Sequence, residues 1–221
     1  MDTVPGNRCP GGTHIDAVVF DIGNVLIAWQ PERFYDREIG EARRRALFNA
    51  VDLHCMNERI DRGEPFRDVI YATAEANPAF RKEIRMWHDR WIELAAPIIP
   101  MSVKLLHALR ARGVPVFALT NFGAESYAYA QTQFDFLNAF DRAFVSGRMR
   151  VTKPDPRIYK MVEEGSGIAP DRLLFTDDRT ENIAAARARG WQTHVFTSPE
   201  GWADSLVAHG LLPPEEATAP L

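Results

Sequence analysis

Residues 18–24 read Val18-Val19-Phe20-Asp21-Ile22-Gly23-Asn24 and change abruptly from apolar to polar at Asp21. The apolar run at 17–20 is continuous rather than alternating, which is typical of a parallel strand that is covered on both faces. A carboxylate that directly follows such a strand lies at the carboxyl end of the sheet, where ligands bind in open α/β folds. We therefore expect a buried first strand that presents Asp21 to a crevice.

Similar apolar runs recur along the chain, and helical patterns separate them. The predicted strands are 114–119, 173–175 and 193–196, with 143–145 as a plausible fifth. An apolar stripe from Val103 to Leu109 predicts a helix that stops at Gly113, and Asp155 is placed to cap a helix that begins at Pro156. A further helix is expected at 179–189. Strands that alternate with helices predict an α/β fold with a Rossmann-like, doubly wound parallel sheet.

Residues 31–97 break this alternation, because no convincing strand is predicted there. Helical stretches are expected instead at 33–39, 41–53, 65–76 and 79–94. An insertion of this length cannot be a simple crossover loop. We predict a small helical cap domain at 31–97, inserted into a core domain that consists of 14–30 and 98–221. Trp87 and Trp91 are four residues apart and so share a helix face, where we expect them to belong to the core of the cap rather than to stack on substrate.

Composition restricts the class of protein. The net charge of −4 argues against a nucleic-acid platform, and no apolar run approaches the length of a membrane span. The two cysteines, Cys9 and Cys55, have no metal-ligand spacing, and no signal-peptide pattern is seen. Residues 1–13 contain prolines and glycines and are expected to form a flexible tail. We expect a cytoplasmic protein, monomeric or homodimeric, that acts on a small molecule rather than on a membrane.

Polar side chains follow two further predicted strands. Thr120-Asn121 ends the strand at 114–119, and Asp177-Asp178 ends the strand that begins at 173. Because the carboxyl ends of parallel strands meet at one edge of a sheet, these residues should share a crevice with Asp21.

Carboxylates in one crevice predict a cation site. Asp177 and Asp178 opposite Asp21 would repel one another unless a cation lay between them. A small set of oxygen ligands favours Mg²⁺. Lys153 precedes a helix start and is the natural counter-charge for an anionic substrate or intermediate. An aspartate can attack phosphorus to form an aspartyl-phosphate, and a metal, a lysine and Thr120 could offset the charge of the transferred group.

These residues resemble the four motifs of the haloacid dehalogenase-like superfamily, in order, over about residues 16–207. The insertion at 31–97 resembles the first type of cap in that superfamily. The resemblance implies that Asp21 is both nucleophile and metal ligand, that Thr120 binds the phosphoryl group and that Lys153 secures both. It further implies Mg²⁺ ligands at Asp178, at Asp177 directly or through water, and at the backbone carbonyl of Gly23.

One position departs from this pattern. Most phosphatases of the superfamily carry a second aspartate two residues after the nucleophile as general acid and base, and here that residue is Gly23. The segment around Asp21, and Phe175-Thr176-Asp177-Asp178 followed by Asn182, resemble a subset that includes bacterial α-glucose 1-phosphate phosphatases.

A missing general acid typically lowers the rate by about 10²–10⁴-fold. Either a cap residue or water donates the proton, with His54, His88 and Glu58 as candidates, or the substrate has a good leaving group, such as an anomeric or acyl phosphate. The second explanation is favoured.

Two residues are candidates for substrate binding. Trp29 lies soon after the first motif, where it either contacts substrate or packs. Asn121 follows Thr120, where it either orients the active-site loop or satisfies a turn.

Three functions therefore stay open. The favoured one is a Mg²⁺-dependent phosphatase that cleaves small phosphate monoesters, above all a sugar phosphate, through an aspartyl-phosphate on Asp21. The segment 153–159 also resembles 2-haloacid dehalogenases, but these need no metal, usually have tyrosine where Gly23 stands and lack the Asp177-Asp178 pair. A catalytically idle binding or regulatory protein would explain the missing acid, although the predicted metal ligands are all retained.

Overall fold

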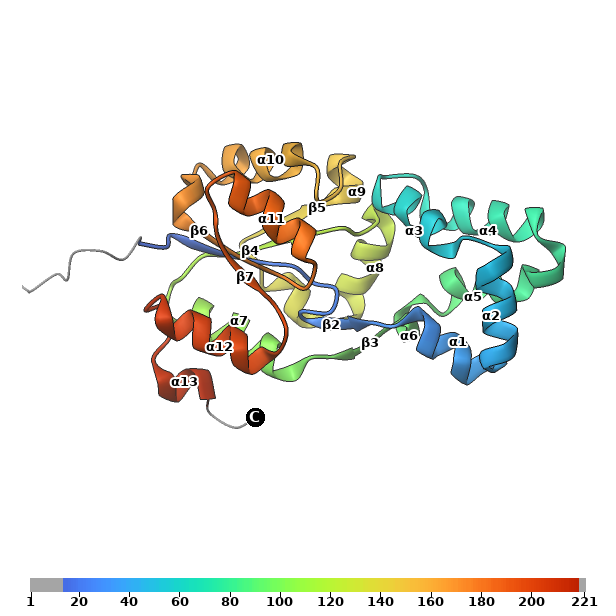
Figure 1. The fold of residues 1–221 in the computed structure, drawn as a ribbon, viewed down its shortest axis with the longest axis horizontal. Helices are drawn as coiled ribbons and strands as arrows, with labels where there is room; N and C mark the ends of the chain where they lie inside the picture. Colours follow the sequence, from blue (N-terminus) through green and yellow to red (C-terminus); the bar gives the residue numbers. More distant parts are fainter. Residues whose placement is uncertain (1–13, 219–221) are drawn as a thin grey trace, which may run out of the picture.

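A parallel sheet forms the centre of the computed structural model, which describes residues 14–218 (Figure 1). The strands of this sheet lie in the order β5-β4-β1-β6-β7. Their bounds are β1 Ala17–Phe20, β4 Val116–Thr120, β5 Arg142–Val145, β6 Leu173–Asp177 and β7 Gln192–Val195. The prediction of a Rossmann-like α/β fold is confirmed. The expected tail at 1–13 lies outside the described residues.

Helices cover both faces of the sheet, because alternate residues of β1 pack to opposite sides. Val18 and Phe20 belong to the apolar cluster that includes α7 and α12, whereas Ala17 and Val19 pack with α10 and α11. Figure 1 shows these two helix pairs on opposite sides of the strands. The helices of this part are α7 Pro100–Ala111, α8 Ala124–Gln133, α9 Ser146–Met149, α10 Pro156–Ser166, α11 Thr180–Ala188, α12 Pro199–Ala208 and α13 Pro214–Thr218.

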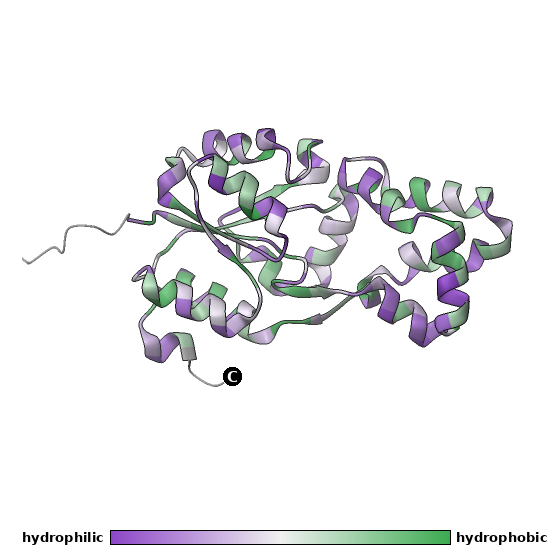
Figure 2. Cartoon of the chain, in the orientation of Figure 1, coloured by the Kyte–Doolittle hydropathy of each residue, from purple (hydrophilic) through white to green (hydrophobic). Residues whose placement is uncertain are grey.

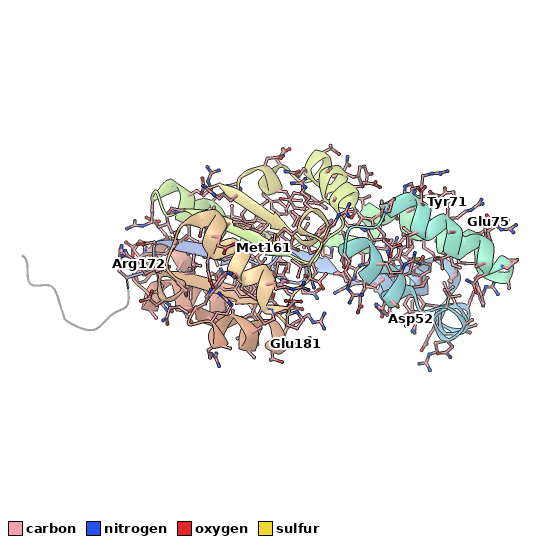
Figure 3. All side chains as sticks on the ribbon, turned by 90° about the horizontal axis from the view of Figure 1, so that it is seen from above. Asp52, Tyr71, Glu75, Met161, Arg172 and Glu181 are labelled. Carbon is pink, nitrogen blue, oxygen red and sulfur yellow. The ribbon has the colours of Figure 1, made fainter. Side chains whose placement is uncertain are left out.

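Residues 31–94 form a separate group of helices, here called the helical lobe. Its helices are α1 Pro31–Ile39, α2 Glu41–Ala50, α3 Leu53–Asp61, α4 Phe66–Ala76, α5 Arg81–Asp89 and α6 Trp91–Leu94. Figure 3 shows the lobe, which carries Tyr71 and Glu75, lying beside the part that carries Met161 and Arg172. Hydrophilic residues dominate α1 and α2, whereas β1 and β4 are hydrophobic (Figure 2).

A two-stranded antiparallel ribbon joins the lobe to the sheet. β2 Ile27–Trp29 leads into the lobe, and β3 Ala95–Ile98 returns from it. No strand was predicted at either place, because both strands are short and their register shifts between Ile27 and Trp29. Apolar runs of this length do not stand out from the surrounding sequence.

The lobe contains one helix that the sequence patterns did not predict. The helix expected at 41–53 ends at Ala50, and α3 begins at Leu53. The side chain of Asp52 accepts a hydrogen bond from the N–H of Cys55 and so caps the new helix. The stretch expected at 79–94 is likewise divided, into a 3₁₀ turn at Pro78–Phe80 followed by α5 and α6.

Trp87 and Trp91 are both buried, as predicted, but they lie on separate helices, α5 and α6, and Trp91 also borders the cavity and packs against Phe122. Trp87 is fully buried and Trp91 is 4% exposed. The indole N–H of Trp87 donates to Oδ1 of Asn57 at 3.2 Å. This hydrogen bond fixes the side chain of Asn57, which lies on α3. None of the described helices is both long enough and apolar enough to cross a membrane.

Candidate active site

The polar residues at the strand ends lie together, as the sheet order requires. Asp21 follows β1, Thr120 is the last residue of β4, and Asp178 follows β6. Together with Lys153, these three residues border a cavity of about 670 Å³ between the sheet and the helical lobe. The cavity lies at the carboxyl ends of the strands, where open α/β sheets bind their ligands.

Lys153 lies between two carboxylates at the bottom of this site. Its Nζ is 2.8 Å from Oδ1 of Asp21 and 2.6 Å from Oδ2 of Asp177, and its side chain is 1% exposed. Burial acts to lower the pKa of Lys153, but the two carboxylates outweigh it and the pKa is raised. Lys153 is therefore a fixed positive charge that holds Asp21 in one orientation.

Asp21 is buried among charged groups. Burial raises the pKa of Asp21 to about 7; Lys153 opposes this rise, and the carboxylates of Asp177 and Asp178 add to it. Burial thus favours the protonated form of this carboxyl group. A cation beside the three carboxylates would favour the ionised form, which is the nucleophilic one.

The three carboxylates could hold a metal ion. Asp21, Asp177 and Asp178 each offer an oxygen atom, and these atoms lie within 4.8 Å of one another. Asp177 is fully buried, and besides Lys153 it accepts hydrogen bonds from the side-chain amide of Asn182 and from the N–H of Arg179. Asp178 is only partly buried and borders the cavity, as Gly23 does. A donor set made of oxygen atoms fits Mg²⁺.

Asn24 supports this carboxylate cluster, and the sequence patterns did not identify it. Its backbone has a φ of 55°, in the left-handed region that asparagine tolerates better than most residues. Its side-chain Nδ2 donates to Oδ2 of Asp178 at 2.9 Å, and its Oδ1 accepts the N–H of Trp29 at 3.0 Å. Polar partners of this kind orient metal-binding carboxylates. The available signal was an asparagine three residues after Asp21.

The two candidate substrate-binding residues both border the cavity. The amide side chain of Asn121 accepts the N–H of Lys153 at 2.8 Å and donates to the carbonyl oxygen of Lys153 at 3.0 Å, so it connects two active-site loops. Trp29 is partly buried, with its ring 5.7 Å from that of Trp87. It packs against the lobe core and forms part of the cavity wall.

The opposite wall of the cavity is the polar face of α3. Leu53, Met56 and Ile60 point into the lobe core. Residues at helical spacing on the other side face the cavity: His54, Asn57, Glu58, Asp61 and, just after the helix, Arg62. Viewed as sequence alone, this face looks like an ordinary solvated helix surface.

The proposed substitute proton donors differ in position. His54 and Glu58 border the cavity, where His54 pairs with Glu32 at 3.0 Å and Glu58 pairs with Arg62 at 3.1 Å. His88 is outside the cavity lining; its ring packs on Phe66. Asp61 also borders the cavity and was not among the predicted candidates.

A family model described as haloacid dehalogenase-like hydrolase matches residues 15–190. The chain belongs to this family. The expected superfamily and the expected class of enzyme, a hydrolase, are thereby confirmed.

Named relatives within this family include phosphatases and a dehalogenase. Sesquiterpene phosphatase AstK of Aspergillus oryzae is 26% identical over 179 residues, which are 80% of this chain and 88% of that protein. Phosphoglycolate phosphatase of Escherichia coli is 28% identical over 60% of this chain, a match that spans only 53% of that enzyme. (S)-2-haloacid dehalogenase H-109 of Pseudomonas putida is 30% identical over 42% of this chain and 41% of its own length.

The fold also matches solved structures of haloacid dehalogenase-like enzymes. A family member from Bacteroides thetaiotaomicron superposes with a TM-score of 0.65, at 22% identity, over 87% of this chain and 98% of that one. This similarity supports the fold assignment.

Proposed function

We propose that this hydrolase is a Mg²⁺-dependent phosphatase that cleaves small phosphate monoesters, with sugar phosphates favoured, through an aspartyl-phosphate on Asp21. The observation that carries the proposal is the carboxylate cluster of Asp21, Asp177 and Asp178 around the buried ammonium group of Lys153. A covalent nucleophile, a fixed positive charge and a set of oxygen ligands in one cavity are the parts that phosphoryl transfer requires.

Each residue would have a defined role in the reaction. Lys153 keeps the carboxylate of Asp21 oriented toward the cavity, where it attacks phosphorus, and Thr120 binds the phosphoryl oxygens. A Mg²⁺ ion held by Asp21, Asp178 and the carbonyl oxygen of Gly23, with Asp177 binding directly or through water, would offset the charge of the phosphoryl group.

The lobe wall supports a neutral, hydroxyl-bearing leaving group. Three carboxylates, those of Glu32, Glu58 and Asp61, border the cavity on this side, against the guanidinium group of Arg62. Glu32 and Glu58 pair there with His54 and Arg62, so the wall offers no unpaired cation to a second anionic group, such as the carboxylate of a glycolate or of a haloacid. Sugar hydroxyls instead donate hydrogen bonds to carboxylates and accept them from amides such as that of Asn57.

A 2-haloacid dehalogenase is the second candidate, favoured by the Pseudomonas putida relative. The same Asp21 would then displace halide from carbon without a metal. The retained Asp177-Asp178 pair, and a lobe wall without an unpaired cation for the carboxylate of a haloacid, both favour the phosphatase over the dehalogenase.

A broad activity screen tests the proposal. Sugar 1-phosphates, sugar 6-phosphates and nucleotides are offered with Mg²⁺, and release of inorganic phosphate is measured. We expect turnover that a chelator abolishes, that added Mg²⁺ restores and that Asp21→Asn lowers by more than about 10³-fold. The exposed Asp171→Asn serves as a matched control and should behave like wild type.

Three results would contradict the proposal. Chloride release from 2-chloropropionate in the presence of chelator would identify a dehalogenase. No turnover of any substrate would support an idle binding protein. Phosphatase activity that survives Asp21→Asn would remove Asp21 as the nucleophile.

A further inference from the structure

Position 23 leaves the nucleophile without a neighbouring proton donor. A Cβ atom built on Gly23 would meet no atom of the described residues within 4 Å, so no other side chain occupies the place of the missing acid. A leaving group that needs a proton would therefore take it from water or from another group in the cavity. Among the carboxyl groups on the lobe wall, Glu32 pairs with His54 and Glu58 pairs with Arg62, and all four side chains are about half exposed.

Asp61 has a different environment from these acids. It is only partly exposed, and neutral groups hold its carboxyl group: Nδ2 of Asn57 donates to Oδ2 at 3.0 Å, and the N–H of Gly123 donates as well. Asn57 is itself fixed by the buried indole of Trp87. The carboxyl group is thus held by neutral donors rather than by a bonded cation, and the charge of nearby Arg62 only partly offsets the effect of burial.

The core also fixes the position of Asp61, although the residue belongs to the lobe. Its backbone oxygen accepts a hydrogen bond from Oγ of Ser146 at 2.6 Å. Gly123, which donates to the carboxyl group, is the third residue after Thr120, and a Cβ atom there would lie 2.4 Å from Cγ2 of Ile60. Only glycine allows α3 to approach this closely. Asp61 is therefore held against the loop that carries the phosphoryl-binding Thr120.

Burial raises the pKa of Asp61 to about 7; Glu58 adds to this rise, and hydrogen bonds from Asn57 and Gly123 oppose it. Arg62, on the lobe, is a further charged group near Asp61, and its positive charge lowers the pKa of Asp61. Other charged groups face Asp61 from across the cavity. Those across the cavity are Asp21, Lys153, Asp178 and Arg179. A carboxyl group with a pKa near the working pH can both release and regain a proton during one catalytic cycle.

We propose that Asp61 is the general acid and base that replaces the aspartate missing at position 23. The proposal rests on the phosphatase function proposed above. In the first step Asp21 forms a bond to phosphorus, the bond from phosphorus to the leaving oxygen breaks, and that oxygen takes the proton of Asp61. In the second step the Asp61 carboxylate takes a proton from a water molecule while the oxygen of that water attacks phosphorus. The bond from phosphorus to Asp21 breaks, so inorganic phosphate is released, Asp21 is again a carboxylate and Asp61 is again protonated.

The test compares Asp61→Asn with wild type on two substrates. One is the best alkyl or sugar phosphate from the screen, whose leaving oxygen needs a proton, and the other is 4-nitrophenyl phosphate, whose leaving group does not. We expect kcat/KM for the first substrate to fall by about 10²–10⁴-fold, whereas the burst of nitrophenol stays within a few-fold of wild type. Asp68→Asn, an exposed lobe aspartate outside the cavity lining, is the matched control and should not change either value.

A second variant and a pH profile strengthen the test. Adding Gly23→Asp to Asp61→Asn places a carboxyl group in the open space at position 23 and should restore part of the lost rate. In wild type, kcat/KM for the alkyl substrate should fall as the pH rises through about 7, because Asp61 then loses the proton that it donates. The nitrophenol burst should not fall in this way, because its leaving group needs no proton. This comparison uses the wild-type protein alone.

The outcomes separate the two proposals. If Asp61→Asn lowers the rates with both substrates equally, Asp61 has only a structural role. If it lowers neither rate, Asp61 takes no part in the reaction. Each result contradicts the inference but is compatible with the phosphatase function. A wild-type protein that releases phosphate from no substrate would instead contradict the phosphatase itself.

Discussion

The side-chain amide of Asn121 pairs with the backbone of Lys153, accepting its N–H at 2.8 Å and donating to its carbonyl oxygen at 3.0 Å. The two residues come from separate loops, one after β4 and one before α10. Because Lys153 in turn pairs with Asp21, the amide acts through Lys153 on the position of Asp21, the proposed nucleophile.

Removal of this amide should impair catalysis more than binding. Asn121→Ala is expected to lower kcat by about 10- to 100-fold, because small displacements of reacting groups are costly, with little change in KM. Steady-state kinetics measure both constants. Asn138→Ala removes an exposed amide that also makes two hydrogen bonds, both to Gln131, and serves as control. An increase in KM alone would show that Asn121 acts by contacting substrate.

Asn24 should set the affinity for metal. Asn24→Gly keeps the left-handed backbone accessible but removes the hydrogen bond to Asp178, so the Mg²⁺ concentration for half-maximal activity should rise by about 10- to 100-fold. Titration of activity with Mg²⁺ measures this shift. Arg150→Gly, at the other described non-glycine residue with positive φ, controls for backbone freedom. An unchanged Mg²⁺ requirement would separate Asn24 from the metal site.

Lys153 should stabilise the fold as well as the reaction. Lys153→Met leaves the carboxylates of Asp21 and Asp177 buried without their cation, and we expect the free energy of unfolding to fall by about 3–5 kcal/mol. Urea denaturation in chelator measures it. The exposed Lys160→Met loses only a surface pair with Glu164 and should change stability by less than about 1 kcal/mol. Equal stabilities of the two variants would rule out a strong buried ion pair.

Asp61 should make stability depend on pH. Its folded pKa of about 7 lies above the ordinary value of 3.8, so its contribution is complete below about pH 4 and is lost as the pH rises through about 7. Asp61→Asn removes this contribution, so the stability of wild type relative to the variant should decline by about 4 kcal/mol between about pH 4 and about pH 8. Urea denaturation at several pH values, with Asp68→Asn as control, provides the measurement. A difference that does not change with pH would mean that Asp61 is ionised throughout.

The sheet could be predicted because its signals are local. The continuous apolar run before Asp21 and the cap at Asp155 each indicate an element within a few residues, and Asp155 does accept the N–H of Arg157 at the start of α10. The strand order then brings Asp21, Thr120 and Asp178 to one edge. Residue types and fold class together were sufficient for this half of the site.

The lobe half of the site could not be predicted in the same way. Leu53, Met56 and Ile60 carry a helical spacing behind the Asp52 cap, but the pattern is short and lies beside a stronger one. The carboxyl group of Asp61 is held by Asn57, which Trp87 fixes in turn, and by the N–H of Gly123 in the core. No sequence spacing connects these residues, because they meet only after the lobe has packed on the sheet.

The hydrogen bond from Ser146 to the backbone of Asp61 is a contact at the joint between lobe and sheet. If the lobe swings away to admit substrate or release product, this bond breaks and the carboxyl group leaves with α3. The open molecule would then admit substrate but lack a proton donor, because Asp21 stays on the sheet while Asp61 moves away with the lobe. An aspartate at position 23 would stay beside Asp21 in both the open and the closed molecule. It could not limit proton donation to the closed state in this way.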